Sequence, residues 1–215
     1  INFTAATQSV TESIGTATIT VQLSATSGKL ITIPFAVNVS STATGGGGDY
    51  ALPASPLIIP AGGTSASISV TVTDDANFET SETVVIDLGT PINANAGPNI
   101  VHTLTITDND PPPTVAFTTT ASTNSESIAT FTIPVSLSAS SSQSISVDYS
   151  VTGGTATSGA DFTLTSGTLT FASGIITQSI SLNVNNDLKD ELDETIILTL
   201  SNPTNTSLGA NTTHT

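Results

Sequence analysis

Apolar and polar residues alternate along short stretches of the chain, with the two-residue period of β-strands. Residues 18–23 and 67–72 show the alternation most clearly, because each stretch has one apolar face. Glycine, proline, asparagine and serine separate the stretches, and none has a helical period. In the first half the expected strands are residues 1–5, 16–24, 31–39, 55–59, 65–73, 83–89 and 101–107. In the second half they are residues 115–119, 129–138, 144–151, 168–172, 178–185 and 195–201.

The same domain pattern occurs twice along the chain. Residues 74–83 (DDANFETSET) correspond to residues 186–195 (NDLKDELDET) at a shift of 112, and His102 corresponds to His214 at the same shift. Glu12 corresponds to Glu126 at a shift of 114, and the extra glycines of residues 45–48 absorb the difference. About seven short strands in each copy predict an all-β fold of two tandem immunoglobulin-like antiparallel β-sandwiches.

Three prolines separate the two copies. Pro111, Pro112 and Pro113 favour an extended, semi-rigid spacer without backbone donors. We therefore expect a first sandwich over residues 1–110, a linker over 111–114 and a second sandwich over 115–215. The second copy reaches only Thr215, the equivalent of Thr103, so we expect its last strand not to be formed by these residues. Residues beyond Thr215, or a strand donated by a neighbouring molecule, would complete that sandwich.

The charge balance narrows the range of partners. The 215 residues include 17 acids, two lysines and no arginine, which gives a formal net charge of −15. Nucleic acid is excluded as a partner because phosphates must be met by lysine or arginine. The chain has no cysteine, which removes thiolate metal sites and thiol catalysis. No apolar run approaches the roughly 18–20 residues that span a bilayer.

The acids are not spread evenly over the predicted sandwich. In an antiparallel sandwich, the first, third and fifth connections and the end of the last strand lie at the same end. Eight of the nine acids in the first copy fall there, namely Glu12, Asp49, Asp74, Asp75, Glu79, Glu82, Asp108 and Asp110. Only Asp87 lies elsewhere, and in the second copy only Asp148 does. The opposite end of the first copy has no acid and carries Lys29.

Crowded carboxylates favour a bound cation. Two unit charges about 4 Å apart repel by roughly 1 kcal/mol in water and about 4 kcal/mol at an effective dielectric constant near 20. Calcium relieves such repulsion, because it takes about 6–8 oxygen ligands from carboxylates, carbonyls and water. Magnesium requires stricter octahedral geometry, and zinc prefers histidine or cysteine. The alternative is a solvated acidic surface, in which acids simply suit turns and would occur at both ends.

Four motifs of the first copy resemble the Calx-beta domain, the calcium-binding module of sodium–calcium exchangers, also found in integrin β4 and bacterial surface proteins. They are Glu12 with Gly15, the glycine run ending in Asp49-Tyr50, Asp74-Asp75 followed by Glu79 and Glu82, and residues 105–110 (TITDND). In the second copy, the matching string VTGGTATSGADFTLTSGTLTF is closer still to the family pattern. The resemblance spans nearly the whole chain.

The resemblance implies a set of calcium ligands. In the first copy they are Glu12, Asp49, Asp74, Asp75, Glu79, Glu82, Asp108 and Asp110, together with the carbonyl group of Asn77. In the second copy they are Glu126, Asp161, Asp187, Glu191 and Glu194. Asn186 replaces Asp74 there, and Lys189 takes the position of Asn77, where its ammonium group substitutes for part of the ionic charge. Asp190 and Asp193 are additional acids, and we expect the second site to be the weaker one.

We expect no enzyme. The chain has no G-x-S-x-G elbow, no P-loop and no H-E-x-x-H motif. His102 and His214 occupy one repeated position at the start of a strand, where a structural role is expected. A glycosidase would need aromatic platforms beside its acids, but the chain has no tryptophan and only Tyr50 and Tyr149.

The sequence therefore predicts a calcium-binding structural or adhesive repeat module of a bacterial cell-surface or secreted protein. Its expected partners are calcium and further repeats of the same polypeptide. Asp108 and Asp110 directly precede Pro111, so calcium is expected to stiffen the junction between the domains. Two alternatives stay open. One is a module that binds a surface glycan or a protein, and the other is a calcium-sensing regulatory domain of a membrane transporter.

Overall fold

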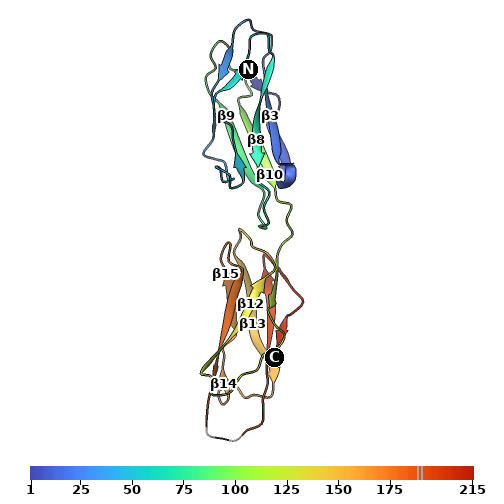
Figure 1. Ribbon diagram of the computed structural model, residues 1–215, viewed down its shortest axis with the longest axis vertical. Coiled ribbons are helices and arrows are strands. Elements are labelled where there is room, and N and C mark those ends of the chain that lie inside the picture. The colour runs from blue at the N-terminus through green and yellow to red at the C-terminus, as the bar shows by residue number, and fades with distance from the viewer. Residues whose placement is uncertain (188, 190) are drawn as a thin grey trace. The chain divides into compact units, whose positions relative to one another are not determined.

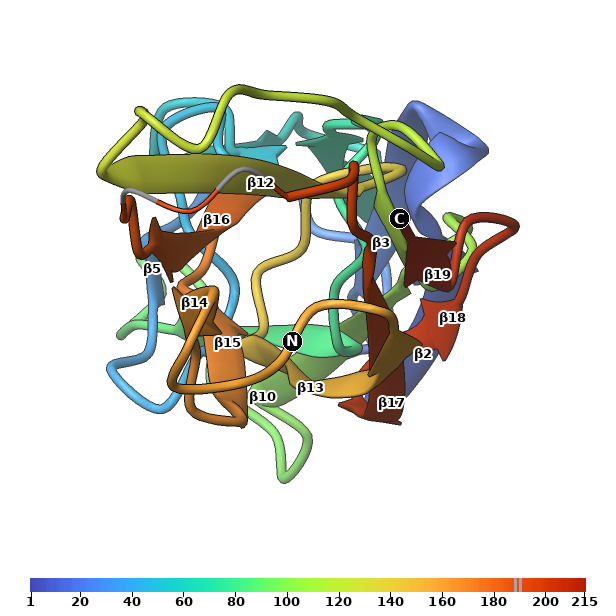
Figure 2. The ribbon, with the colours of Figure 1, turned by 90° about the horizontal axis from the view of Figure 1, so that it is seen from below.

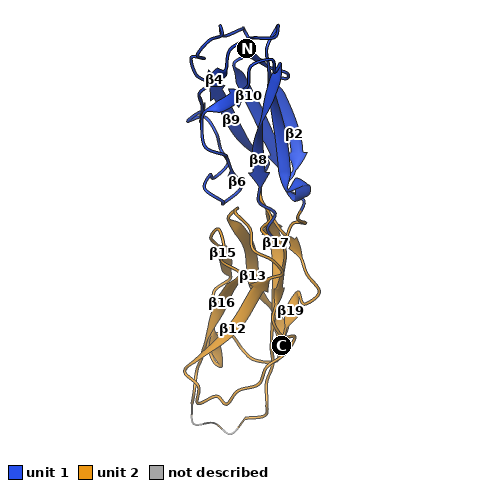
Figure 3. Cartoon of the chain, turned by 45° about the horizontal axis from the view of Figure 1, so that its top comes forward, with its two compact units in different colours: residues 1–75, 80–109 blue, residues 76–79, 110–215 orange. Residues whose placement is uncertain are grey.

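The structure is a computed structural model of the 215-residue chain (Figure 1) and describes residues 1–187, 189 and 191–215. The chain forms two compact units, one of residues 1–75 and 80–109 and one of residues 76–79 and 110–215 (Figure 3). The short segment Ala76–Glu79 follows the strand Ser65–Val72 in sequence but belongs to the second unit.

The first unit is a β-sandwich. One sheet has the order β1-β3-β8-β6, the other has the order β2-β10-β9-β5, and β4 pairs separately with β7. The strands are β1 (Asn2–Phe3), β2 (Thr7–Thr11), β3 (Thr16–Gln22), β4 (Ile31–Ile33), β5 (Phe35–Val37), β6 (Tyr50–Ala51), β7 (Leu57–Ile59), β8 (Ser65–Val72), β9 (Glu82–Leu88) and β10 (Val101–Thr107). The 3-10 helix η1 (Glu12–Ile14) joins β2 to β3.

Alternating residues build the core of the first unit. Ile19 and Val21 of β3 and Ile68 and Val70 of β8 are almost completely buried, while their neighbours in sequence face outward. Their side chains pack against residues of the other sheet, including Ile86, as two facing sheets require. The period-two pattern of the sequence is thus the pattern of burial.

The structure differs from the expected strands at two places. The expected strand over residues 1–5 is only β1, antiparallel to β3, and the sequence did not predict β2, which pairs in parallel with β10 in the opposite sheet. The stretch expected as one strand over residues 31–39 breaks at Pro34 into β4 and β5, because proline has no N–H group to donate to a ladder. The crossing to β2 matters for the site, since it brings Thr11 opposite Thr107.

The second unit repeats this architecture. Figure 2 shows its two facing layers, of which one has the order β14-β16-β12-β11-β18 and the other the order β15-β13-β17-β19. The strands are β11 (Thr114–Phe117), β12 (Thr130–Leu137), β13 (Ile145–Gly154), β14 (Phe162–Thr163), β15 (Gly167–Phe171), β16 (Thr177–Val184), β17 (Ile196–Thr204), β18 (Ser207–Leu208) and β19 (Thr213–His214). Both units are therefore immunoglobulin-like β-sandwiches, as the sequence predicts.

We expected that the residues up to Thr215 do not form the last strand of the second sandwich. This expectation was wrong for two residues. Thr213 and His214 form β19, which pairs antiparallel with Leu198 and Thr199 of β17. The physical reason is the anchoring of His214, which is buried and whose Nδ1 donates a 2.8 Å hydrogen bond to the Thr119 carbonyl.

The repeated histidines have the same structural setting in both units. His102 is buried, donates from Nδ1 to the Ala5 carbonyl at 2.9 Å, and lies with its ring centroid 5.4 Å from that of Phe3. The ring of His214 lies 5.5 Å from that of Phe117, and its Nε2 accepts a 2.7 Å hydrogen bond from Ser122. Each histidine thus ties the first segment of its sandwich to the last strand. Within the described part of the chain, no helix has the length and apolar character to cross a membrane.

Candidate metal centres

One pair of predicted ligands follows a pair of neighbouring strands in the first unit. Because Thr11 of β2 lies opposite Thr107 of β10, the next residues, Glu12 and Asp108, leave the sheet side by side. Carboxylate oxygens of Glu12 and Asp108 lie within 4.8 Å of each other. Glu12 is only 4% exposed, so this carboxylate is removed from most of its water. A buried carboxylate beside a second one is costly unless a cation or hydrogen bonds compensate.

A second pair forms where the long glycine loop meets β8 and β9. The Asp49 carbonyl accepts a 2.9 Å hydrogen bond from the Thr73 N–H at the end of β8. The Asp49 carboxylate accepts from the Thr44 N–H and thereby closes the loop of Gly45–Gly48. Carboxylate oxygens of Asp49 and Glu82 lie within 4.8 Å of each other. Burial and, second, the charge of Asp49 raise the pKa of Tyr50, as expected beside concentrated negative charge.

Asn109 organises the first unit's acidic loops, a role that the sequence interpretation did not assign to it. Its side-chain oxygen accepts a 3.1 Å hydrogen bond from the Ser13 N–H of η1, and its amide donates at 3.2 Å to Asp74. The amide thus holds the loop after β2 to the loop after β8. The feature of the sequence that could have indicated this role was the position of Asn109 between Asp108 and Asp110.

The other predicted ligands of the first copy are divided between the units. Asp75 is exposed and belongs to the first unit. Asn77, Glu79 and Asp110 belong to the second unit, where the side-chain oxygen of Asn77 accepts a hydrogen bond from Ser140.

The second unit contains a corresponding acidic group. Carboxylate oxygens of Asp161, Glu191 and Glu194 all lie within 4.8 Å of one another. Asp161 and Glu194 correspond to Asp49 and Glu82 at the shift of 112, so the same pair of positions converges in both units. Glu194 shows the effect of this crowding, because burial and then the charge of Asp161 raise its pKa.

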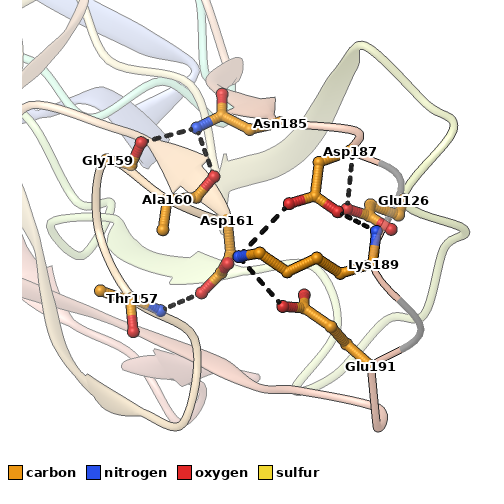
Figure 4. Close-up of polar contacts among 9 residues, drawn as sticks. All are labelled: Glu126, Thr157, Gly159, Ala160, Asp161, Asn185, Asp187, Lys189 and Glu191. Carbon is orange, nitrogen blue, oxygen red and sulfur yellow. Dashed lines mark hydrogen bonds and ion pairs between the residues drawn. The ribbon is translucent and has the colours of Figure 1, made fainter.

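Asn185 holds the loop that presents Asp161, and the sequence interpretation also missed this residue (Figure 4). Its side chain donates to the carbonyl oxygens of Gly159 and Ala160 at 3.1 and 2.8 Å. Its N–H donates to the Asp161 carbonyl at 2.9 Å, as Thr73 does for Asp49 in the first unit. The Asp161 carboxylate accepts a 2.5 Å hydrogen bond from the Thr157 N–H. The signal in the sequence was the correspondence of Asn185 with Thr73.

Three acids of the second unit lie around Lys189, namely Asp187, Glu191 and Glu126 (Figure 4). The Lys189 ammonium lies 3.5 Å from an Asp187 oxygen and 3.7 Å from a Glu191 oxygen. The Asp187 N–H donates a 3.2 Å hydrogen bond to Glu126, which brings a fourth loop residue to this group. The charge of Asp187, its hydrogen bond to Lys189 and the charge of Glu191 raise the pKa of Lys189. Asp193 is exposed, and Asp190 lies outside the described residues.

Asp87 and Asp148 lie within strands and outside the acidic groups described above, and both have neutral partners. Asp87 of β9 accepts a 2.7 Å hydrogen bond from Asn38. Asp148 of β13 accepts from Thr168 at 2.5 Å and from Asn202 at 3.0 Å, and these bonds lower its pKa.

The donor set of these loops fits a hard cation. It consists of carboxylate oxygens from separate loops, with backbone carbonyls close by and neither cysteine nor histidine. This chemistry suits calcium better than zinc. The fold and the site therefore define a class of protein, tandem β-sandwiches with carboxylates gathered on loops.

The family follows from comparison with known proteins. The Calx-beta domain family matches residues 1–110 and 108–214. The chain therefore belongs to the Calx-beta family and consists of two tandem domains of this calcium-binding kind, which confirms the resemblance seen in the sequence. A comparison with curated protein sequences found no match.

Several solved structures are similar to the chain. The structure of CBD12 from CALX1.2 is 22% identical and has a TM-score of 0.47, with 94% of this chain and 79% of that chain covered. The calcium binding domain CBD12 of CALX1.1 is 20% identical with the same TM-score of 0.47 and the same coverage of 94% and 79%. The apo-form Calx CBD1 domain is 21% identical with a TM-score of 0.46, and the match covers 51% of this chain and 96% of that one.

Proposed function

We propose that the chain is a calcium-binding structural repeat of a bacterial cell-surface or secreted protein, with one acidic site at the loops of each sandwich. The observation that carries this proposal is the repeated convergence of Asp49 with Glu82 and of Asp161 with Glu194. Each pair joins two segments that are distant in sequence. Turn preference alone accounts for acids in loops, but it does not bring the same two positions together in both units.

Electrostatics gives calcium its role at these sites. Like charges at such separations repel by roughly 1 kcal/mol in water and about 4 kcal/mol at an effective dielectric constant near 20. Bound calcium would supply two positive charges and accept several oxygen ligands at once. Each loop then becomes tied to the others through a shared ion, so the ion stabilises the folded arrangement by its binding free energy.

The proposed structural role rests on repetition and on the linker. Repeated domains form arrays in which each repeat contacts its neighbours, and such arrays reach across distances or present surfaces. Asp108 and Asp110 stand immediately before Pro111–Pro113, a stretch with restricted backbone freedom. An ion held by these acids would restrain the start of the linker, and calcium would then stiffen the junction between repeats.

The alternatives have less support. The second unit has a shallow groove lined by Asp148, Tyr149, Ser150, Ser166, Gly167, Thr168 and Ser201, of which only Tyr149 is aromatic. Glycan sites rely on aromatic platforms, so this groove does not favour glycan binding. A regulatory calcium sensor requires a transporter in the same polypeptide, and the sequence of the full gene distinguishes that case.

Isothermal titration of the intact chain with calcium tests the proposal. We expect at least one binding site and a higher melting temperature in calcium than in chelator, because the ion binds the folded state. Magnesium at the same concentration is the control and should bind more weakly. No binding heat together with an unchanged melting temperature at millimolar calcium would reject calcium binding.

A further inference from the structure

The loop between β12 and β13 holds a segment from the first half of the chain, within the second unit. The Phe78 N–H donates a 3.1 Å hydrogen bond to the Ser140 carbonyl, and the Ser142 N–H donates at 3.0 Å to the Phe78 carbonyl. Phe78 and Ser141 form a parallel β-bridge, and the Ser140 side chain contacts that of Asn77. Main-chain pairing of this kind is also a way in which proteins bind an extended segment from another domain.

Ser141 is the centre of this docking loop. Its hydroxyl donates a 3.1 Å hydrogen bond to the Phe78 carbonyl and accepts one of 3.0 Å from the Gln143 N–H. Its carbonyl accepts a 2.9 Å bond from the Gly174 N–H, which fixes the loop to the turn before β16. Ser141 is only 3% exposed, although it lies in a loop.

The loop between β3 and β4 in the first unit has the same local structure. Residues 23–27 (LSATS) correspond to residues 137–141 (LSASS) at the shift of 114. The Ser27 hydroxyl accepts a 3.1 Å bond from the Lys29 N–H, and the Ser27 carbonyl accepts a 2.8 Å bond from the Gly62 N–H. Both bonds repeat those of Ser141, because Lys29 and Gly62 correspond to Gln143 and Gly174.

The two loops differ in what covers them. Ser141 is buried, whereas Ser27 is half-buried and Thr26 and Gly28 are exposed. The groups that correspond to the docking groups of the second unit are the Thr26 carbonyl and the Gly28 N–H. Among the described residues, neither has a hydrogen-bond partner. The first unit thus contains the docking loop with the same two hydrogen bonds but open to solvent.

We propose that residues 25–28 are a docking site for the corresponding segment of a preceding Calx-beta repeat. That segment would donate an N–H to the Thr26 carbonyl and accept from the Gly28 N–H and the Ser27 hydroxyl, as Phe78 does in the second unit. The partner is a further repeat with an asparagine–phenylalanine pair in this loop. A second copy of this chain is a poorer partner, because its own Asn77 and Phe78 already pair with residues 140–142.

Disulfide trapping tests the proposal, and the absence of cysteine from the chain removes any background. A further copy of residues 1–114 is fused in front of Ile1. Thr114 of the added copy then directly precedes Ile1, just as Thr114 precedes Val115 in the chain itself. Asn77→Cys in the added copy is combined with Thr26→Cys in the following copy. The control pair replaces Thr26→Cys by Ser69→Cys, an exposed position in the middle of β8.

We expect the Thr26 pair to form its disulfide about tenfold more readily than the Ser69 pair, a preference of about 1.4 kcal/mol. In the unextended chain, the pair Asn77→Cys and Ser140→Cys tests the contact that the structure shows. Its disulfide should form as readily as that of the Thr26 pair. Equal rates for the Thr26 and Ser69 pairs would overturn the proposal, and so would failure of the Ser140 pair. The docking contacts are hydrogen bonds between protein groups, so carrying out the experiment in both calcium and chelator separates its outcome from that of calcium binding.

Discussion

At the scale of single residues, the carboxylates of this chain fall into two kinds. Asp75 belongs to the predicted ligand set and is exposed in the loop after β8, whereas Asp87 lies on β9 and accepts a hydrogen bond from Asn38. An aspartate of this chain is therefore a proposed metal ligand or a structural hydrogen-bond acceptor, depending on whether it lies in an acidic loop or on a strand.

This difference predicts the outcome of two matched substitutions. Asp75→Asn removes one full negative charge from the proposed site, so calcium affinity should fall by at least about tenfold, the loss that even outer ligand partners cause. Glu79→Gln should act in the same direction. Calcium titration of the intact variants measures the effect, and Asp87→Asn is the control. An affinity change in Asp87→Asn equal to that in Asp75→Asn would show that overall charge, and not the site, governs binding.

Lys189 provides a second prediction at this scale. Its ammonium neutralises part of the charge of Asp187 and Glu191, and the raised pKa keeps it protonated throughout the neutral range. Its ion pairs are therefore present below its ordinary pKa and are lost only as the pH rises through the raised value. Because the ammonium competes with a bound cation, Lys189→Gln should strengthen calcium binding by the second domain.

Lys29→Gln is the matched control for that substitution, since it removes the other lysine of the chain. Lys29 lies in the loop between β3 and β4, where the sequence has no acid. Calcium titration of both variants at neutral pH separates the local from the overall effect of charge. Equal gains in affinity from the two substitutions would contradict a local role for Lys189.

At the scale of elements, strand ends decide where the acids meet. β2 and β10 pair in parallel up to Thr11 and Thr107, and the two carboxylates that follow emerge together. β13 runs on as far as Gly154, opposite Ile196, and the loop that follows it carries Asp161. The positions of the acidic loops thus depend on strand register.

The end of β13 gives a prediction about that register. Gly154 has a φ of +118°, and a Cβ there would collide with the Thr195 carbonyl oxygen. Gly154→Ala should therefore lower the free energy of unfolding of the second unit by at least about 1–3 kcal/mol. Scanning calorimetry should show one transition moved to lower temperature.

Gly153→Ala is the neighbouring control. A Cβ at Gly153 meets only Ile197, with Cδ1 at 3.5 Å and Cβ at 3.9 Å, which are ordinary van der Waals distances, and the φ of Gly153 is not positive. The expected change in its melting temperature is small. If Gly153→Ala and Gly154→Ala destabilised the chain equally, backbone conformation would not be the cause.

The strands themselves could be predicted because their signal is local. Alternation over residues 67–72 became β8, and alternation over 18–23 became most of β3. The strand β2 could not be predicted in this way, because its parallel pairing with β10 joins residues almost 100 positions apart. The short strand β19 was missed for the same reason, since a buried histidine and a carbonyl from the start of the domain hold it in place.

At the scale of the whole molecule, the proposed stiffening of the junction makes a prediction in solution. If calcium restrains the start of the proline linker, small-angle scattering should report a longer and better-defined particle in calcium than in chelator. The ion can favour a stiff arrangement only by binding it more tightly than the flexible one. Identical scattering profiles under both conditions, with binding shown by titration, would reject the stiffening while leaving the calcium site intact.

The sequence by itself determined the all-β class, the two copies, the family and the clustering of most acids around the loops. Those features depend on residue type, short-range periodicity and internal repetition, which are readable along the chain. Only the tertiary structure decided which acids meet, that Asn109 and Asn185 hold the loops, and that Ala76–Glu79 belongs to the second unit. These outcomes depend on hydrogen bonds between residues far apart in sequence, and no local pattern encodes which distant carbonyl or carboxylate an amide will reach.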